Sequence, residues 1–170
     1  MTRDGSVERI GDQRVLRFER RLEHPVDRVW AAITEPGQML GWWAEAELDL
    51  REGGSVVLRW QNTDDEGNQA VLHGEVTELD PPRLFEIAGD PHGVLRFELE
   101  PAGDACLLTF TSTVPAPDDV LPLALAGWHV HLDHLDQLLA GDPVDWEHWD
   151  ERHRPAWEQA HERYLATSGA

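Results

Sequence analysis

The sequence predicts an α+β domain in which a curved antiparallel sheet is covered on one face by a long C-terminal helix. Three observations lead to this prediction. Six apolar or alternating runs of strand length occupy the region from Glu47 to Val114. Turn sequences rich in glycine, proline and aspartate separate the runs, as in an antiparallel meander. A helical stripe of apolar residues from Leu121 to Leu139 then supplies a cover for the open face of the sheet.

The first elements precede that sheet. Residues 1–12 are polar and are expected to form a flexible tail, so that a single domain spans residues 13–170. RVLRFERRL (residues 14–22) alternates apolar and charged residues as a strand does. Apolar residues at helical spacing predict a helix over residues 24–37, with Pro25 in its first turn and a stop at Pro36-Gly37. Residues 38–45 are predicted to form a short second helix.

The six strands of the meander and the turns between them follow in order. The predicted strands are AELDL, SVVLRWQ, QAVLHGEVTEL, RLFEIAG, VLRFELE and ACLLTFTSTV. The turns are REGG, TDDEGN, DPPR, DPHG and PAGD. We expect Leu95, Phe97 and Leu99 to share an inward face with Leu107 and Thr109 of the neighbouring strand.

The C-terminal part returns to helical periodicity. The apolar stripe of the long helix has a spacing of four and three residues and consists of Leu121, Leu125, Trp128, Leu132, Leu135 and Leu139. Gly141-Asp142-Pro143 ends this helix. The tryptophan-rich segment from Asp145 to Ala166 is predicted to add one or two short helices as a C-terminal extension.

Composition excludes several function classes. The chain has 33 acidic and 14 basic residues and a formal charge of -19, which argues against nucleic acid and anionic membrane surfaces as partners. All basic residues are arginines, so a Schiff-base lysine and a phosphate-loop lysine are both excluded. Cys106 is the only cysteine and lies in an apolar run, so an intrachain disulfide cannot form. The polar N-terminus and the lack of a long apolar stretch predict a cytoplasmic protein without membrane insertion.

Several motifs resemble a known family. PVDRVWAAITEPGQMLGWW, REGGSVVLRW, HGEVTELDPPRLFEI and AGWHVHLDHLDQLL occur in the order found in the SRPBCC or START-like superfamily. Within it, the similarity is to the branch homologous to the activator of the heat-shock-protein-90 ATPase, and it runs from about Leu16 to the C-terminus. The resemblance implies a helix-grip fold, in which the sheet grips the C-terminal helix around a hydrophobic tunnel.

The resemblance does not imply one activity. Relatives include lipid carriers, hormone receptors, polyketide cyclases and oxygenase domains, so the fold alone does not decide the function. The cochaperone role belongs to relatives with an additional N-terminal domain, for which this chain has no room, and we do not expect it here. Thr111 stands where many relatives have a histidine, so chemistry that uses that imidazole is not expected either.

We therefore expect a protein that binds a small hydrophobic molecule in the tunnel, without a cofactor. The expected ligand-binding residues are Trp43, Trp60, Phe97, Leu99, Thr109, Thr111, Trp128, His131, Leu132 and Leu135. Two other function classes stay open. One is a cyclase- or dehydratase-like enzyme that moves a proton with a wall residue such as His131. The other is a ligand-free regulatory protein that could form a homodimer through its tryptophan-rich tail.

Three histidines on the long helix raise the question of a metal. A helical wheel places His131 on the shoulder of the apolar stripe, His129 on the opposite shoulder beside Asp133, and His134 nearly opposite the stripe. Imidazoles that point in such different directions cannot converge on one tetrahedral ion, so no metal site is predicted.

Overall fold

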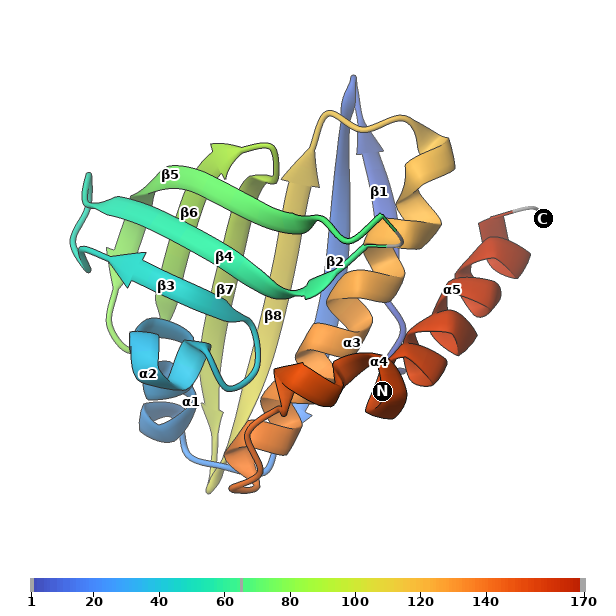
Figure 1. The fold of residues 1–170 in the computed structure, drawn as a ribbon. Coiled ribbons are helices and arrows are strands. Elements are labelled where there is room, and N and C mark those ends of the chain that lie inside the picture. The colour runs from blue at the N-terminus through green and yellow to red at the C-terminus, as the bar shows by residue number, and fades with distance from the viewer. Residues whose placement is uncertain (1, 65, 169–170) are drawn as a thin grey trace.

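The structure is a computed structural model that describes residues 2–64 and 66–168. Within these residues, one eight-stranded antiparallel sheet has the order β1-β2-β8-β7-β6-β5-β4-β3 (Figure 1). The strands are β1 (Ser6–Ile10), β2 (Gln13–Leu22), β3 (Ala44–Leu48), β4 (Ser55–Thr63), β5 (Gln69–Asp80), β6 (Leu84–Asp90), β7 (Gly93–Ala102) and β8 (Ala105–Val114). The predicted meander is confirmed, because each strand from β3 to β7 pairs with the next strand in the sequence.

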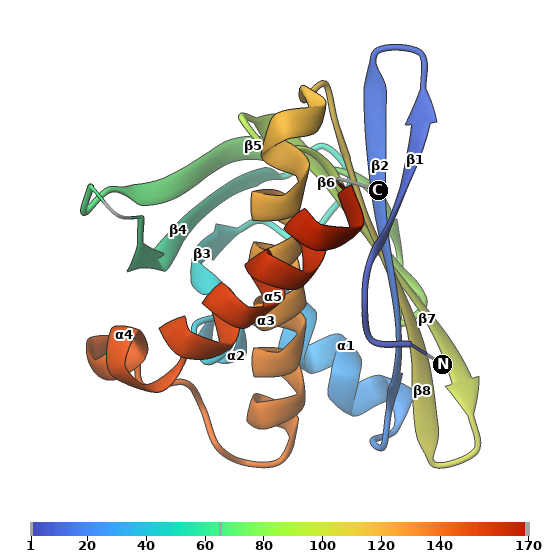
Figure 2. The ribbon, with the colours of Figure 1, turned by 90° about the vertical axis from the view of Figure 1, so that its right-hand side faces the viewer.

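The helices occupy the concave side and one end of the sheet. Two short helices, α1 (Val26–Thr34) and α2 (Pro36–Met39), connect β2 to β3. The long helix α3 (Leu121–Leu139) runs along the hollow of the curled sheet, and α5 (Arg154–Ser168) crosses it diagonally (Figure 2). The turn helices η1 (Asp118–Val120) and η2 (Trp146–His148) and the one-turn helix α4 (Trp149–Arg152) complete the elements. This is the α+β helix-grip arrangement that the sequence predicts.

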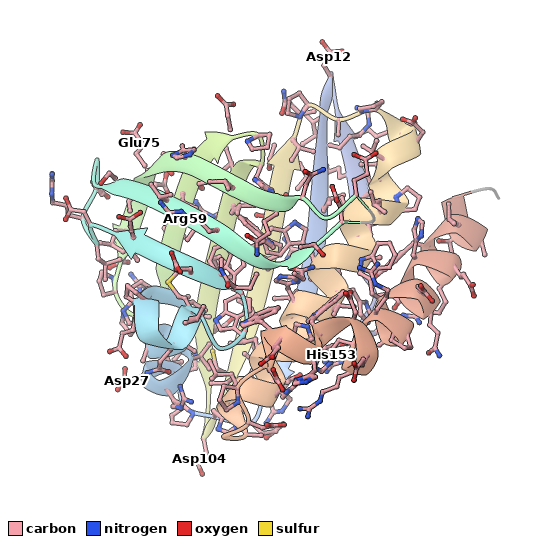
Figure 3. The ribbon with its side chains drawn as sticks, in the orientation of Figure 1. Asp12, Asp27, Arg59, Glu75, Asp104 and His153 are labelled. Carbon is pink, nitrogen blue, oxygen red and sulfur yellow. The ribbon has the colours of Figure 1, made fainter. Side chains whose placement is uncertain are left out.

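The sequence-based prediction of a flexible tail over residues 1–12 is wrong for its second half. Ser6–Ile10 forms β1, which pairs with β2 through registers such as Val7 opposite Leu16. Gly11 makes the turn between the two strands with a φ of 58°, a conformation that glycine adopts without strain. Figure 3 marks Asp12 at the tip of this hairpin and Asp104 at the tip of the β7–β8 hairpin, at opposite ends of the sheet.

The second predicted helix is shorter than expected. It ends at Met39, and the chain turns through Trp42 and Trp43 into β3 at Ala44. Tertiary contacts override the helical spacing here, because the Trp42 indole N–H donates a hydrogen bond to the carbonyl of Ala32 at 2.8 Å. The turn therefore fixes both indoles in the core, where each is fully buried.

The core lies between the concave face of the sheet and α3. Registers of Phe97 opposite Phe110 and Leu99 opposite Leu108 place these four side chains on the inner face. Alternate residues on the same strands are only partly buried and belong to the outer face. The sheet therefore has one face buried in the core and one face in contact with solvent.

Helix α3 is buried on more than one side. Its apolar stripe faces the sheet, as predicted, and the residues of the stripe are at most 7% exposed. A second apolar cluster of Val130, Val144 and Trp149 covers another side of the helix. The segment after residue 140 thus closes over α3, and polar residues of this helix become buried as well. The described residues include no helix that is long and apolar enough to cross a bilayer.

Candidate functional site

An open cleft of about 350 Å³ lies where the β4–β5 hairpin approaches the start of α3 and the C-terminal helices. Its lining comes from five elements and the hairpin turn. The lining residues are Trp60, Asn62, Thr63, Asp64, Asn68, Gln69, Ala70, Leu123, Trp149, Arg154 and Trp157. The volume is at the small end of the range for small-molecule sites, about 300–1,000 Å³.

Three tryptophans from β4, α4 and α5 form the apolar part of this cleft. Trp60 is 8% exposed and is held at its edges by Trp43 and Trp128, with ring centroids 6.0 and 6.1 Å away. Trp149 is fixed by a hydrogen bond from its indole N–H to Nε2 of His134 at 3.0 Å. Trp157 is partly buried against the cluster of Val130, Val144 and Trp149. The indoles are therefore preorganised rather than free to collapse into the space.

The cleft has one unsatisfied polar atom and several satisfied ones. Oδ1 of Asn62 is buried and has no hydrogen-bond partner among residues 2–64 and 66–168. In contrast, the Gln69 amide donates to the carbonyl of Gln61 at 3.1 Å. The main-chain N–H groups of Asn68 and Glu66 donate hydrogen bonds to the Asp64 carboxylate. These bonds, and the one from Asn68 most, hold the pKa of that carboxyl below its ordinary value.

Arg154 brings a positive charge to the cleft, but its guanidinium group is already engaged by other groups of the protein. Its Nε donates to Asp150 at 2.8 Å, and its Nη2 donates to the carbonyl of Thr63 at 3.3 Å. The guanidinium carbon also lies 5.5 Å from the centroid of the Trp149 ring, within the range of a cation–π contact. These contacts join α5 to the β4–β5 hairpin across the cleft.

Behind Trp60, the space between sheet and helix is occupied by aromatic rings. Trp128 of α3 lies 4.5 Å from Phe110 and 6.0 Å from Trp43, and Phe97 lies 5.4 Å from Trp43, measured between ring centroids. Four of the predicted ligand-binding residues, Trp43, Trp60, Phe97 and Trp128, therefore meet in one cluster. Their rings pack against one another in the region in which a tunnel was expected.

The predicted aliphatic lining surrounds this cluster. Leu132 and Leu135 are fully buried, and Leu99 is 4% exposed. Among the ten predicted binding residues, Trp60 is the one that reaches the cleft.

Two predicted binding residues lie on the wrong face of the sheet. Thr109 pairs with Glu98 and Thr111 pairs with Arg96, both outer-face residues, while Phe110 between them points inward. Leu107 belongs to the same outer face as Thr109. The expectation that the threonines line the tunnel is therefore wrong.

The histidines of α3 are more buried than the helical wheel predicted. His134, expected to point away from the apolar stripe, is 2% exposed because Trp149 and Trp146 pack over it. Its ring centroid lies 5.7 Å from that of His131 and 4.6 Å from that of His153, a residue marked in Figure 3 at the end of α4. Burial first, and then the neighbouring His131 and His153, lower the pKa of His134 to about 2.

His131 is a neutral, buried side chain. Burial lowers its pKa to about 4, although the Gly127 carbonyl favours the charged form. Nδ1 lies 3.1 Å from that carbonyl, which can only accept, so Nδ1 carries the proton and Nε2 is the acceptor. Nε2 makes no hydrogen bond of normal geometry in the described part of the chain, although the main chain of Trp43 also favours the charged ring. The ring is 3% exposed and does not reach the cleft.

His129 belongs to a separate charged region at the other shoulder of α3. The expected proximity to Asp133 is confirmed, with 3.6 Å between Nε2 and Oδ2, and Nδ1 is 2.8 Å from the hydroxyl of Tyr164. Arg20 lies there with its guanidinium 1% exposed and 3.6 Å from Asp133. None of the three guanidinium nitrogens of Arg20 has a hydrogen-bond partner within the described residues. Burial lowers the pKa of Arg20, and Asp133 opposes this effect.

The histidines of α3 do not converge on a common point that could hold an ion. Within the described residues, potential ligand atoms come together at the surface, in Asp145, Glu147 and His148 of the segment around η2. His148 is already hydrogen-bonded to Asp145 at 2.8 Å. This acidic surface group gives no independent sign of a metal.

Comparisons with known proteins agree on family and fold. The family model for Activator of Hsp90 ATPase homolog 1-like protein matches residues 23–140. The crystal structure of CalU16 from Micromonospora echinospora is 25% identical, with a TM-score of 0.74, and the alignment covers 99% of this chain and 98% of that one. A protein from Bordetella parapertussis is 28% identical, with a TM-score of 0.68 and coverages of 95% and 90%. NE0264 from Nitrosomonas europaea is 22% identical, with a TM-score of 0.65 and coverages of 78% and 97%. No curated protein matches the chain significantly.

Several residues of the cleft were not predicted from the sequence. Asn62, Leu123, Trp149, Arg154 and Trp157 line the cleft but were not among the predicted binding residues. The tryptophan-rich tail was a usable signal for Trp149 and Trp157. No pattern in the sequence indicates that this tail returns to the β4–β5 hairpin.

Proposed function

Because the chain belongs to the Activator of Hsp90 ATPase homolog 1-like family, we propose that it binds a small apolar molecule at the mouth of its helix grip. The ligand lies in the cleft between Trp60, Trp149 and Trp157, with Leu123 at the rim. The ring cluster behind Trp60 serves as a rigid floor. This places the predicted ligand at the open end of the sheet–helix interface instead of deep inside it.

One observation supports this proposal above the others: three indoles, from β4, α4 and α5, border an open cleft of about 350 Å³. Apolar side chains that border water are stabilised when a ligand covers them, by about 25 cal/mol for each Å² removed from water. Preorganised side chains also reduce the entropy lost on binding. A cleft of this kind suits an apolar ligand of modest size.

The two other function classes find less support. An enzyme that uses His131 as a base would need contact between substrate and a ring that is 3% exposed, and a base with a pKa of about 4 is weak at neutral pH. A dimer through the tryptophan-rich tail would need free indoles, whereas Trp149 is packed on α3.

The test is a titration with an apolar reporter dye, monitored by its fluorescence. We expect saturable binding with a Kd in the micromolar range, on the order of -8 kcal/mol. Leu123→Trp fills the cleft from its rim and should weaken binding about ten-fold. Leu165→Trp is the matched control, because Leu165 is as exposed as Leu123 (49% against 50%) but does not line the cleft. Weak, non-saturating signals, or equal effects of both variants, would refute the proposal.

A further inference from the structure

Buried polar atoms without partners gather around Trp60. Asn62 follows Trp60 by two residues on β4, and His92 stacks on the Trp60 ring with centroids 4.5 Å apart and planes 6° from parallel. Oδ1 of Asn62 and Nδ1 of His92 are both buried, and neither has a hydrogen-bond partner in the parts of the chain that the structure describes. Of these two residues, Asn62 lines the cleft.

An unsatisfied buried carbonyl oxygen is unfavourable in the empty protein. Native proteins satisfy the great majority of such atoms, and an unsatisfied one weakens the fold or is completed by a ligand or ordered water. The amide oxygen of Asn62 is an acceptor only, so its missing partner must be a hydrogen-bond donor. Asn62 lines the cleft, so a rotation of its side-chain amide toward the cleft brings this oxygen within reach of a ligand hydroxyl or N–H group at the floor.

The charges around the cleft favour a neutral ligand. Asp64 places an ionised carboxylate at the rim, and the whole chain carries a formal charge of -19, so an anion is repelled. A cation is repelled by the Arg154 guanidinium, which lines the cleft and already lies over the Trp149 ring. Arg154 is also paired with Asp150 and is not a counter-ion for an acidic ligand.

We propose that the ligand is a neutral, planar ring compound of about two fused rings that carries a hydroxyl or N–H group, and that Asn62 selects it by accepting a hydrogen bond from that group. This inference rests on the proposed function, because it assumes that the cleft is the binding site. The flat faces of the ring contact the indoles, and the donor group turns toward the floor. Asn62 is then a specificity-determining residue.

The test compares 2-naphthol with 2-methoxynaphthalene, which has the same ring system but cannot donate a hydrogen bond. The wild-type protein should bind 2-naphthol about ten-fold more tightly, because the ether leaves the Asn62 oxygen unsatisfied. Asn62→Leu should lower the preference to about one while it retains affinity for the ether. Asn62→Asp keeps an acceptor of the same shape and should retain or increase the preference.

Gln69→Leu is the matched control. Gln69 lines the same cleft, but its amide is engaged by Gln61, so the ten-fold preference should remain in this variant. Thermal melts of each variant check that the fold is intact before affinities are compared. Tighter binding of 2-naphthoate than of 2-naphthol would overturn the inference of a neutral ligand.

The outcomes separate this inference from the proposed function. If both naphthalene probes bind saturably with equal affinity and Leu123→Trp weakens both, the cleft binds ligands but Asn62 does not select a donor, and the inference is overturned. If neither probe nor the reporter dye binds saturably, the proposed function fails and the inference fails with it. A preference that Asn62→Leu leaves unchanged also overturns the role of Asn62.

Discussion

Mild acid should destabilise the contact between α3 and the C-terminal segment. His131 and His134 are buried and neutral there, with pKa values of about 4 and about 2, below the value near 6.5 of an unfolded chain. A histidine whose pKa is lowered by folding makes its full contribution to the free energy of unfolding at pH values above its pKa in the unfolded chain. That contribution is lost as the pH falls below about 6.5, since the unfolded chain then binds more protons than the folded one.

The expected loss follows from the separation of the pKa values. At pH 5 the unfolded imidazole is protonated and both folded ones are not, so each histidine reduces the free energy of unfolding by about 2 kcal/mol, from 1.36 kcal/mol per pH unit. The sum of about 4 kcal/mol is large beside a typical total of about 5–15 kcal/mol. His153 faces His134 from α4 but is more exposed, and its smaller effect has the same sign because burial lowers its pKa.

Urea denaturation at a series of pH values between 7.5 and 5 measures this loss. The double variant His131→Phe/His134→Phe keeps both rings but removes their titration, so its free energy of unfolding should vary less with pH than that of the wild type. His148→Gln is a control that should change the pH dependence of the free energy of unfolding in the opposite direction. The hydrogen bond to Asp145 raises the pKa of His148, so its removal should slightly steepen the acid loss. If the difference between wild type and double variant did not change with pH, the reasoning would be refuted.

Two further substitutions test the core and the charged region beside α3. Trp128→Ala should lower the free energy of unfolding by about 3 to 5 kcal/mol, because the indole packs against Phe110 and Trp43 and its removal leaves a cavity. An unchanged melting temperature would contradict this prediction. Arg20→Met should leave stability within about 1 kcal/mol of the wild type or increase it, as an unsatisfied buried charge is replaced by an apolar chain. Urea denaturation decides this case, and a loss above about 3 kcal/mol would show that the ion pair with Asp133 is essential.

Periodicity predicts the fold well because each element carries its own pattern. The alternating runs of β4 to β8 and the leucine stripe of α3 are determined by which side of each element meets the core. The sequence is ambiguous where both faces of a strand are apolar. In CLLTFT, Leu107 and Leu108 suit either face, and the inward face was assigned to Leu107 and Thr109 instead of Leu108 and Phe110. Only pairing with β7 resolves that choice.

The site was less predictable than the fold because it depends on contacts between distant segments. A helical wheel treats α3 as having one buried and one exposed side, and so it placed His134 in solvent. In the structure the segment after residue 140 buries that histidine through Trp149. The same segment turns the region beside Trp60 into a cleft. Local patterns contain no information on where such a segment lies, although the number of tryptophans in it indicates that it packs on something.

The two walls of the cleft have different origins along the chain. Trp60 and Leu123 lie within residues 23–140, which the family model matches, whereas Trp149, Arg154 and Trp157 lie beyond that range. The second wall packs on the outer side of α3 and not between α3 and the sheet, because Trp149 clusters with Val130 and Val144. Chimeric proteins that exchange the segment after residue 140 between relatives should therefore change the shape of the proposed cleft, while Asn62 in the first wall keeps the proposed preference for a hydrogen-bond donor.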